Sequence, residues 1–155
     1  MQKILFICTG NICRSPAAEA ICRNKLDKLG ILSNYELDSA GIQGHHIGES
    51  PDCRVFIEGE KRGYDLSQIH SRQLILDDFY YFDIILAMTN HHLEYLKSHQ
   101  PPDSIVSIKL LSNFVDNNHM QDITDPYYGS REDFSKMYDH LEEIGEKFIL
   151  KITKN

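Results

Sequence analysis

Short apolar runs that alternate with helical stretches constrain the fold of this chain more than any other feature. Three runs have the length and the continuous apolar character of strands buried on both faces: KILFIC at 3–8, DIILAMT at 83–89 and VSIKLL at 106–111. Residues 35–39 (YELDS) alternate as a fourth strand does. Strands separated by helices predict a parallel sheet, because parallel neighbours need long crossover connections.

Helix signals fill the stretches between these runs. Proline in the first turn and glycine after the end mark two of the expected helices. The expected helices cover residues 16–29, 51–62 and 91–98, and a polar loop is expected over 112–129. After this loop, apolar residues recur at helical spacing and predict an amphipathic helix from Arg131 onwards: Phe134, Tyr138, Leu141, Ile144, Phe148 and Ile152.

These elements predict an α/β fold in which a single domain spans residues 1–155. We expect a three-layer sandwich with a central, mostly four-stranded parallel sheet and helices on both faces. A chain of 155 residues is long enough to bury one core. Ligands of such sheets bind at the carboxyl ends of the strands, so the segment after Cys8, where the first strand ends, is the first place to expect a site.

Charge and targeting features narrow the function further. Sixteen Lys+Arg against 23 Asp+Glu give a net charge of −7, which argues against nucleic-acid binding. No apolar run approaches the ~20 residues of a membrane span, and the start of the chain lacks a signal-peptide pattern. We therefore expect a cytoplasmic protein with four free thiols: Cys8, Cys13, Cys22 and Cys53.

Residues 8–15 (CTGNICRS) have the form C-x5-R-S between the first strand and the first helix. The backbone N–H groups of such a turn, with the N-terminus of the following helix, form a cradle for phosphate. Arg14 adds a planar guanidinium that can bind two phosphate oxygens, and Gly10 and Asn11 suit left-handed backbone angles. These positive surroundings favour the thiolate form of Cys8, and the hydroxyl of Ser15 could donate a hydrogen bond to its sulfur. The loop residues expected at the phosphate are Thr9, Gly10, Asn11, Ile12, Cys13 and Ser15.

A metal centre is a weaker interpretation of the same residues. Cys8 and Cys13 have no second Cys/His pair to complete a tetrahedral set. The doublets at 45–46 and 91–92 join neighbouring histidines, whose side chains do not face the same way. We expect neither a metal nor a cofactor.

The segment LFICTGNICRSPAAEA at residues 5–20 resembles the signature of the low-molecular-weight protein tyrosine phosphatases. The resemblance covers nearly the whole chain in the family's order, through SAG at 39–41, GESPDCR at 48–54, RQ at 72–73 and DPYYG at 125–129. It implies the family's fold and its activity, the hydrolysis of phosphotyrosine through a phosphocysteine. Cys8 would be the nucleophile and Arg14 would bind the phosphate.

Such a reaction needs a carboxyl group that protonates the leaving oxygen and later deprotonates water. The polar loop offers Asp116, Asp122 and Asp125, and the residue types alone do not choose among them. The resemblance chooses Asp125, because Pro126 follows it. It also implies a substrate rim formed by His45, Tyr127 and Tyr128.

The resemblance further implies supporting residues outside the loop: Glu19, Ser39 and His70. Asn11 is expected to hydrogen-bond to Ser39 and hold the loop open, and Glu19 is expected to pair with His70 beneath the site. Two positions depart from the family pattern. His45 stands where many relatives have Trp, and Thr89 stands where many have Asp.

Two other activities are known on the same fold. The branch that removes phosphate from arginine typically has Thr in place of Ile12, so Ile12 favours tyrosine. Arsenate reductases share the loop but pass a disulfide to further cysteines in a mobile segment, and residues 80–100 contain no cysteine. The expected partners are therefore phosphotyrosine proteins, with inorganic phosphate and other oxyanions as inhibitors. We expect a monomer or a weakly self-associating protein.

Overall fold

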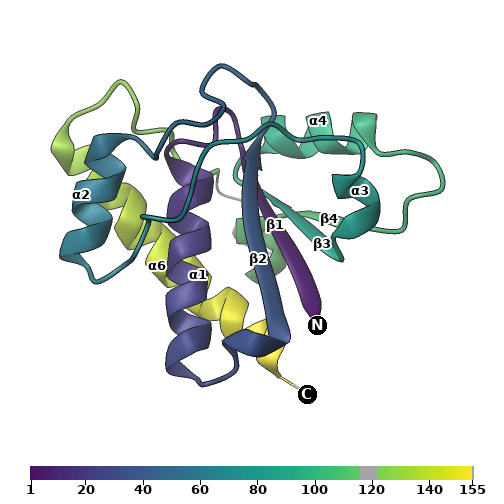
Figure 1. The fold of residues 1–155 in the computed structure, drawn as a ribbon, viewed down its shortest axis with the longest axis horizontal. Helices are drawn as coiled ribbons and strands as arrows, with labels where there is room; N and C mark the ends of the chain where they lie inside the picture. The colour runs from purple at the N-terminus through teal and green to yellow at the C-terminus, as the bar shows by residue number, and fades with distance from the viewer. Residues whose placement is uncertain (116–121, 155) are drawn as a thin grey trace.

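The computed structural model describes residues 1–115 and 122–154. Four strands form one parallel sheet in the order β2-β1-β3-β4 (Figure 1). They are β1 (Gln2–Cys8), β2 (Tyr35–Gly41), β3 (Ile84–Ala87) and β4 (Ser107–Leu110). The predicted four-stranded parallel sheet is confirmed. Cys8 is paired with Gly41 at the carboxyl end of β1, so the segments that follow β1 and β2 leave the sheet side by side.

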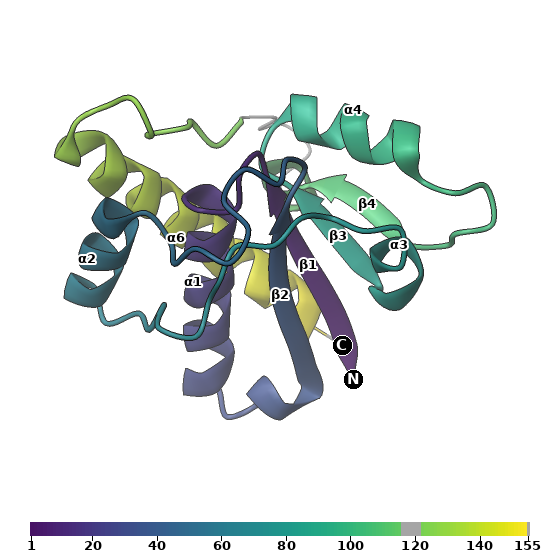
Figure 2. The ribbon, with the colours of Figure 1, turned by 45° about the horizontal axis from the view of Figure 1, so that its top comes forward.

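Helices cover both faces of the sheet, which confirms the three-layer arrangement (Figures 1 and 2). One layer contains α1 (Arg14–Lys28), α2 (Cys53–Lys61) and α6 (Arg131–Thr153), and the other contains α3 (Asp78–Tyr81) and α4 (Asn90–His99). Side chains of β1 alternate between the two layers. Ile4 and Phe6 join the core beneath α1 and α6, whereas Leu5 and Ile7 join the core beneath α4.

Several element boundaries differ from the sequence-based prediction. The helix expected from Pro51 begins at Cys53, because the Asp52 side chain caps it by accepting a hydrogen bond from the backbone N–H of Arg54. The predicted polar loop over 112–129 is wrong at its start, where α5 (Leu111–Val115) directly follows β4. The single turns η1 (Leu32–Asn34) and α3 were not predicted, since elements this short leave little periodicity in the sequence.

The C-terminal helix α6 closes the larger of the two cores. Phe148 is fully buried, and its ring contacts the ring of Phe6 edge to face at 6.4 Å between centroids. The hydroxyl of Tyr138, also fully buried, donates a hydrogen bond of 2.7 Å to the carbonyl of Val55 and so ties α6 to α2. Among the helices of the described residues, none has the length and apolar character needed to cross a membrane.

Replacing Phe148 with alanine should destabilise the protein without touching the site described below. Truncation of a fully buried phenylalanine removes its contacts with Phe6 and leaves a cavity, which typically lowers the free energy of unfolding by about 3–5 kcal/mol. Denaturant unfolding measures the change, and Phe148→Leu serves as the control that keeps most of the volume. Equal stability of the alanine variant and the parent would show that α6 does not anchor this core.

Candidate active site

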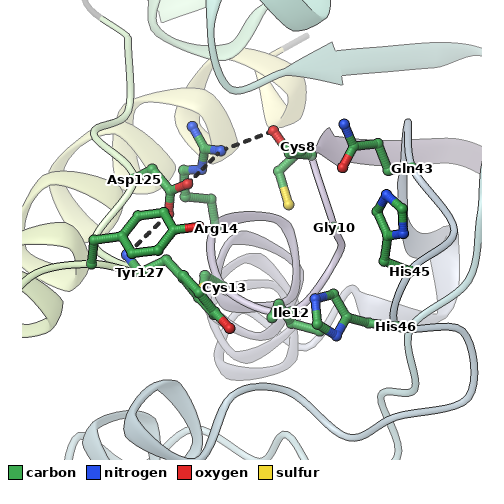
Figure 3. A pocket seen from close by; sticks show the side chains of 12 residues that line it. Cys8, Gly10, Ile12, Cys13, Arg14, Gln43, His45, His46, Asp125 and Tyr127 are labelled. Carbon is green, nitrogen blue, oxygen red and sulfur yellow. Dashed lines mark hydrogen bonds and ion pairs between the residues drawn. The ribbon is translucent and has the colours of Figure 1, made fainter.

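The loop between β1 and α1 lines a cavity of about 270 Å³ at the carboxyl edge of the sheet (Figure 3). The walls come from three places in the chain: this loop, the segment after β2 and the segment before α6. The lining residues are Cys8, Thr9, Gly10, Ile12, Cys13, Arg14, Gln43, His45, His46, Asp125, Tyr127 and Tyr128. In Figure 3 the sulfur of Cys8 points into the space that the loop encloses.

Asn11 fixes the shape of the loop from beneath. It is fully buried and adopts a left-handed backbone conformation with φ of 59°, whereas Gly10, expected to share that conformation, does not. Its Oδ1 accepts a hydrogen bond of 3.0 Å from the backbone N–H of Arg72. Because a backbone N–H can only donate, this bond also sets the orientation of the amide, and Nδ2 then donates to Ser15 Oγ at 2.7 Å.

Ser15, oriented by Asn11, contacts the sulfur of Cys8. Ser15 Oγ lies 3.0 Å from Cys8 Sγ, and both residues are buried. Since Ser15 Oγ accepts its bond from Asn11, the hydroxyl proton of Ser15 is available for the sulfur. A hydroxyl aimed at sulfur stabilises the thiolate, the form in which a cysteine is a nucleophile.

The carbonyl groups of the loop are engaged by donors outside it. Cys8 and Thr9 accept from the backbone N–H groups of Ile42 and Gln43 at 3.0 and 2.9 Å. The carbonyls of Gly10 and Ile12 likewise accept from the Ser71 hydroxyl and the Asp52 backbone. These bonds turn the negative ends of the peptide dipoles outward, which leaves the positive ends for an anion.

Gly41 permits this close approach of the loop to β2. A Cβ atom at position 41 would lie 2.7 Å from the carbonyl oxygen of Thr9 and 3.0 Å from the backbone nitrogen of Asn11. Any side chain here would therefore displace the loop itself.

Arg14 is 5% exposed and is held by three contacts. Its Nη1 donates to the carbonyl of Ile123 at 3.2 Å, and its Nη2 donates to Thr9 Oγ1 at 3.3 Å. The same Nη2 lies 3.5 Å from Asp125 Oδ2 (Figure 3). The third nitrogen of the guanidinium, Nε, is buried without a hydrogen-bond partner among the described residues. A buried guanidinium with a donor to spare suits an oxyanion ligand.

Of the two candidate aspartates that the structure describes, Asp125 lines the cavity and Asp122 does not. Its side chain is 45% exposed, and Oδ1 accepts a hydrogen bond of 3.1 Å from the backbone N–H of Tyr127. Asp122 instead accepts from the backbone N–H of Asn90, at the start of α4. Asp116 lies outside the described residues.

Aromatic and imidazole side chains line the mouth of the cavity. Tyr127 and Tyr128 contact each other edge to face at 4.9 Å, and the Arg54 guanidinium lies over the Tyr127 ring. His45 lines the cavity as expected for the rim. His46, considered above only as half of a histidine doublet, and Gln43, which was not predicted, line it as well. Gln43 follows the carboxyl end of β2, so strand topology could have found it.

Comparison with known proteins gives these residues a context. A sequence profile described as low molecular weight phosphotyrosine protein phosphatase matches residues 3–155. This chain belongs to that family. It is 37% identical over 152 residues to the human low molecular weight phosphotyrosine protein phosphatase, covering 97% of this chain and 95% of the human one.

Solved structures agree with the family assignment. The crystal structure of a protein tyrosine phosphatase from Entamoeba histolytica superimposes with a TM-score of 0.91 at 36% identity, covering 99% of this chain and 98% of that one. The crystal structure of a Drosophila arginine phosphatase gives a TM-score of 0.89 at 31% identity and covers 100% of this chain and 99% of that one. The protein is a phosphatase by family, and phosphoproteins are the substrates that this membership implies.

Two pairings implied by the resemblance to this phosphatase family are wrong. Ser39 donates a hydrogen bond of 2.7 Å to Glu19 Oε1 rather than meeting Asn11, whose partners are Ser15 and the Arg72 backbone. His70 is exposed, and the second oxygen of Glu19 accepts from Arg23 at 2.9 Å. Burial raises the pKa of Glu19, although the bonds from Ser39 and Arg23 oppose that shift. Glu19 and Ser39 therefore join α1 to β2, and His70 takes no part.

The four cysteines are free thiols in different surroundings. Burial, together with the charge of Asp52, raises the pKa of Cys13, so this thiol stays protonated at neutral pH. Burial raises the pKa of Cys22 to about 12. Cys53 is exposed on α2 and does not line the cavity. Cys8 is the one beside the Ser15 hydroxyl.

Replacing Asn11 with alanine should lower both the activity and the stability of the phosphatase. Asn11→Ala leaves Ser15 without its orienting donor and forces alanine into a left-handed conformation. We expect a loss of about 2–4 kcal/mol in the free energy of unfolding and roughly tenfold or more in kcat. Denaturant unfolding and turnover of an aryl phosphate measure the two effects.

Asn11→Gly separates the two causes, because glycine tolerates the left-handed backbone but still lacks the amide. This variant should retain more stability than Asn11→Ala and lose as much activity. Full activity in both variants would show that Asn11 does not orient Ser15.

Proposed function

We propose that the protein hydrolyses phosphotyrosine in proteins through a covalent phosphocysteine intermediate on Cys8. The observation that carries this proposal is the placement of Cys8 Sγ at 3.0 Å from the Ser15 hydroxyl, in one cavity with Arg14 and Asp125. A nucleophile, an anion-binding cation and a carboxyl group are the three parts that a phosphate monoester transfer to sulfur requires.

In the first step, the thiolate of Cys8 attacks phosphorus and forms an S–P bond while the bond from phosphorus to the tyrosine oxygen breaks. Asp125 gives its proton to the departing phenolic oxygen. Arg14 stabilises the charge on the three equatorial oxygens, together with the loop N–H groups, whose carbonyls are bonded to donors outside the loop. The buried Nε of Arg14, which has no partner among the described residues, supplies one donor for this purpose.

In the second step, water attacks phosphorus and the S–P bond breaks. Asp125, now a carboxylate, takes the proton of the attacking water. The products are inorganic phosphate and the Cys8 thiolate. The Ser15 hydroxyl stabilises this leaving sulfur as it did the attacking one, because its proton remains directed by Asn11. Inorganic phosphate and other tetrahedral oxyanions are therefore inhibitors in this proposal.

Depth and aromatic rim favour phosphotyrosine as the substrate. Cys8 is 2% exposed, so a phosphate must enter the cavity fully before the sulfur can reach it. The long aryl group of phosphotyrosine spans that depth, whereas the short side chain of phosphoserine would bring the substrate backbone against the rim. Tyr127 and Tyr128 offer aromatic surface to the ring. Ile12, which lines the cavity, favours tyrosine over arginine in the proposal.

The setting of this activity is also part of the proposal. We place the enzyme in the cytoplasm as a monomer or a weakly self-associating protein, with phosphotyrosine proteins as its partners. All four cysteines are free thiols, and the mechanism depends on one of them staying reduced.

Replacing the nucleophile and the acid should affect turnover in different ways. Cys8→Ser should abolish hydrolysis of p-nitrophenyl phosphate, whereas Cys53→Ser, which alters an exposed cysteine away from the cavity, should retain it. Asp125→Asn should lower kcat on phosphotyrosine by roughly 10²–10⁴-fold. Its loss on p-nitrophenyl phosphate should be smaller, since that leaving group needs less help from a proton. Activity that survives Cys8→Ser, or that disappears in EDTA, would reject the mechanism.

A panel of matched phosphopeptides tests the substrate assignment. Among peptides of one sequence carrying phosphotyrosine, phosphoserine or phosphoarginine, the phosphotyrosine peptide should be hydrolysed much faster than the other two. Ile12→Thr should raise the relative rate on phosphoarginine, because it shortens the apolar side chain in the cavity. Faster hydrolysis of phosphoarginine by the parent enzyme would reassign the substrate while leaving the phosphocysteine chemistry in place.

A further inference from the structure

A buried histidine outside the cavity contacts the phosphate loop. His92 lies in the first turn of α4 and is 1% exposed. Figure 2 shows this end of α4 beside the carboxyl end of β1. The Nε2 atom of His92 lies 2.8 Å from Thr9 Oγ1, and its Nδ1 is buried without a hydrogen-bond partner among the described residues. An imidazole buried with one nitrogen unpaired is costly, so its retention calls for a physical reason.

The unpaired nitrogen indicates where the ring carries its proton. A buried N–H without an acceptor costs more than a buried lone pair without a donor. We therefore assign the proton to Nε2, which makes His92 the donor and Thr9 Oγ1 the acceptor at 2.8 Å. Burial, reinforced by the positive charge of Arg14, lowers the pKa of His92 to about 3, so the ring is neutral at physiological pH.

Thr9 thus receives two hydrogen bonds on one oxygen. His92 Nε2 donates to it from one side, and Arg14 Nη2 donates to it at 3.3 Å from another. Two donors fill both lone pairs of the hydroxyl oxygen, so the hydroxyl proton of Thr9 is not used by either partner. Thr9 lines the cavity next to Cys8, where an oxyanion would offer an acceptor for that proton.

We propose that His92 is a positioning residue for the phosphate loop, which acts through Thr9 to hold the Arg14 guanidinium and to free the Thr9 hydroxyl for a bound oxyanion. This proposal rests on the proposed function, because it takes the loop to be the phosphate site. A neutral imidazole suits the task better than lysine or arginine. It supplies a short, directed N–H without placing a second positive charge beside Arg14.

Isosteric replacements of His92 separate positioning from simple filling of the core. In His92→Gln the side-chain NH₂ can reach the place of Nε2, whereas in His92→Asn it reaches only the place of Nδ1. His92→Phe fills the volume with no donor. We expect His92→Gln to keep kcat for p-nitrophenyl phosphate and the affinity for inorganic phosphate within about twofold of the parent. His92→Asn and His92→Phe should each lower kcat and the affinity for inorganic phosphate by roughly fivefold to tenfold, which corresponds to one hydrogen bond of about 1 kcal/mol.

The partner of His92 is tested with Thr9→Val, which removes the hydroxyl and keeps the branched shape. If His92 acts through Thr9, His92→Phe should have little further effect in the Thr9→Val background. Additive losses in the double variant would overturn the proposal. So would a His92→Phe variant with the phosphate affinity of the parent, or a His92→Gln variant no better than His92→Asn. If His92→Phe does not fold, the comparison of Gln with Asn decides.

Calorimetric binding of inorganic phosphate keeps this test independent of turnover. A parent protein that binds phosphate but hydrolyses no aryl phosphate would reject the proposed function, while the same variants would still decide the role of His92. An active parent whose His92 variants bind phosphate as tightly as it does would reject the positioning role alone.

Discussion

The loop between β1 and α1 is held by a series of hydrogen bonds that begins at a group that can only donate. The backbone N–H of Arg72 can only donate, so it sets the amide of Asn11, which sets the hydroxyl of Ser15, which faces the sulfur of Cys8. Each of these hydrogen bonds fixes the orientation of the next group in the series. In the proposed mechanism this series orients Cys8 as the nucleophile, and it extends from the segment after α2 to the start of α1.

The parallel sheet is what brings those segments to one place. Cys8 pairs with Gly41 at the carboxyl ends of β1 and β2, and Ile7 pairs with Ala87 of β3. The loop carbonyls can therefore bond to the backbone that follows β2, while α4, which follows β3, reaches Thr9 from the other side. Asn11, through the Arg72 backbone, and His92, through Thr9, fix the loop at two separate points.

The sequence predicted the sheet well because buried strands and their long crossovers leave a strong pattern. The C-x5-R-S spacing after the first strand also pointed to the loop whose Cys8 and Arg14 line the cavity. The sequence could not predict α5 or the start of α2, where a single cap or an abrupt strand end decides the boundary. The partners of Glu19 and His70 were wrong for a different reason. Side-chain pairing depends on three-dimensional placement, and a resemblance assigns a role to a position without knowing that Ser39 and Arg23 satisfy the carboxylate of Glu19. His92 was weighed only as half of a metal pair, since nothing in the sequence places it against Thr9.

In the proposed function a chain with a net charge of −7 binds a dianion, which is possible because the groups that would bind it act at short range. Charges on the surface are screened over about 8 Å at physiological ionic strength, whereas groups inside the cavity act over one hydrogen-bond length with little water between them. Arg14 is 5% exposed, and the loop carbonyls are turned outward by donors from elsewhere. A cation and N–H donors therefore line the cavity although the protein as a whole is acidic. The groups that support the loop are therefore best left uncharged. A negative side chain at position 11 or 92 would compete with the anion for Arg14, and a positive one would repel Arg14. The amide of Asn11 and the neutral imidazole of His92 orient the loop without altering its charge.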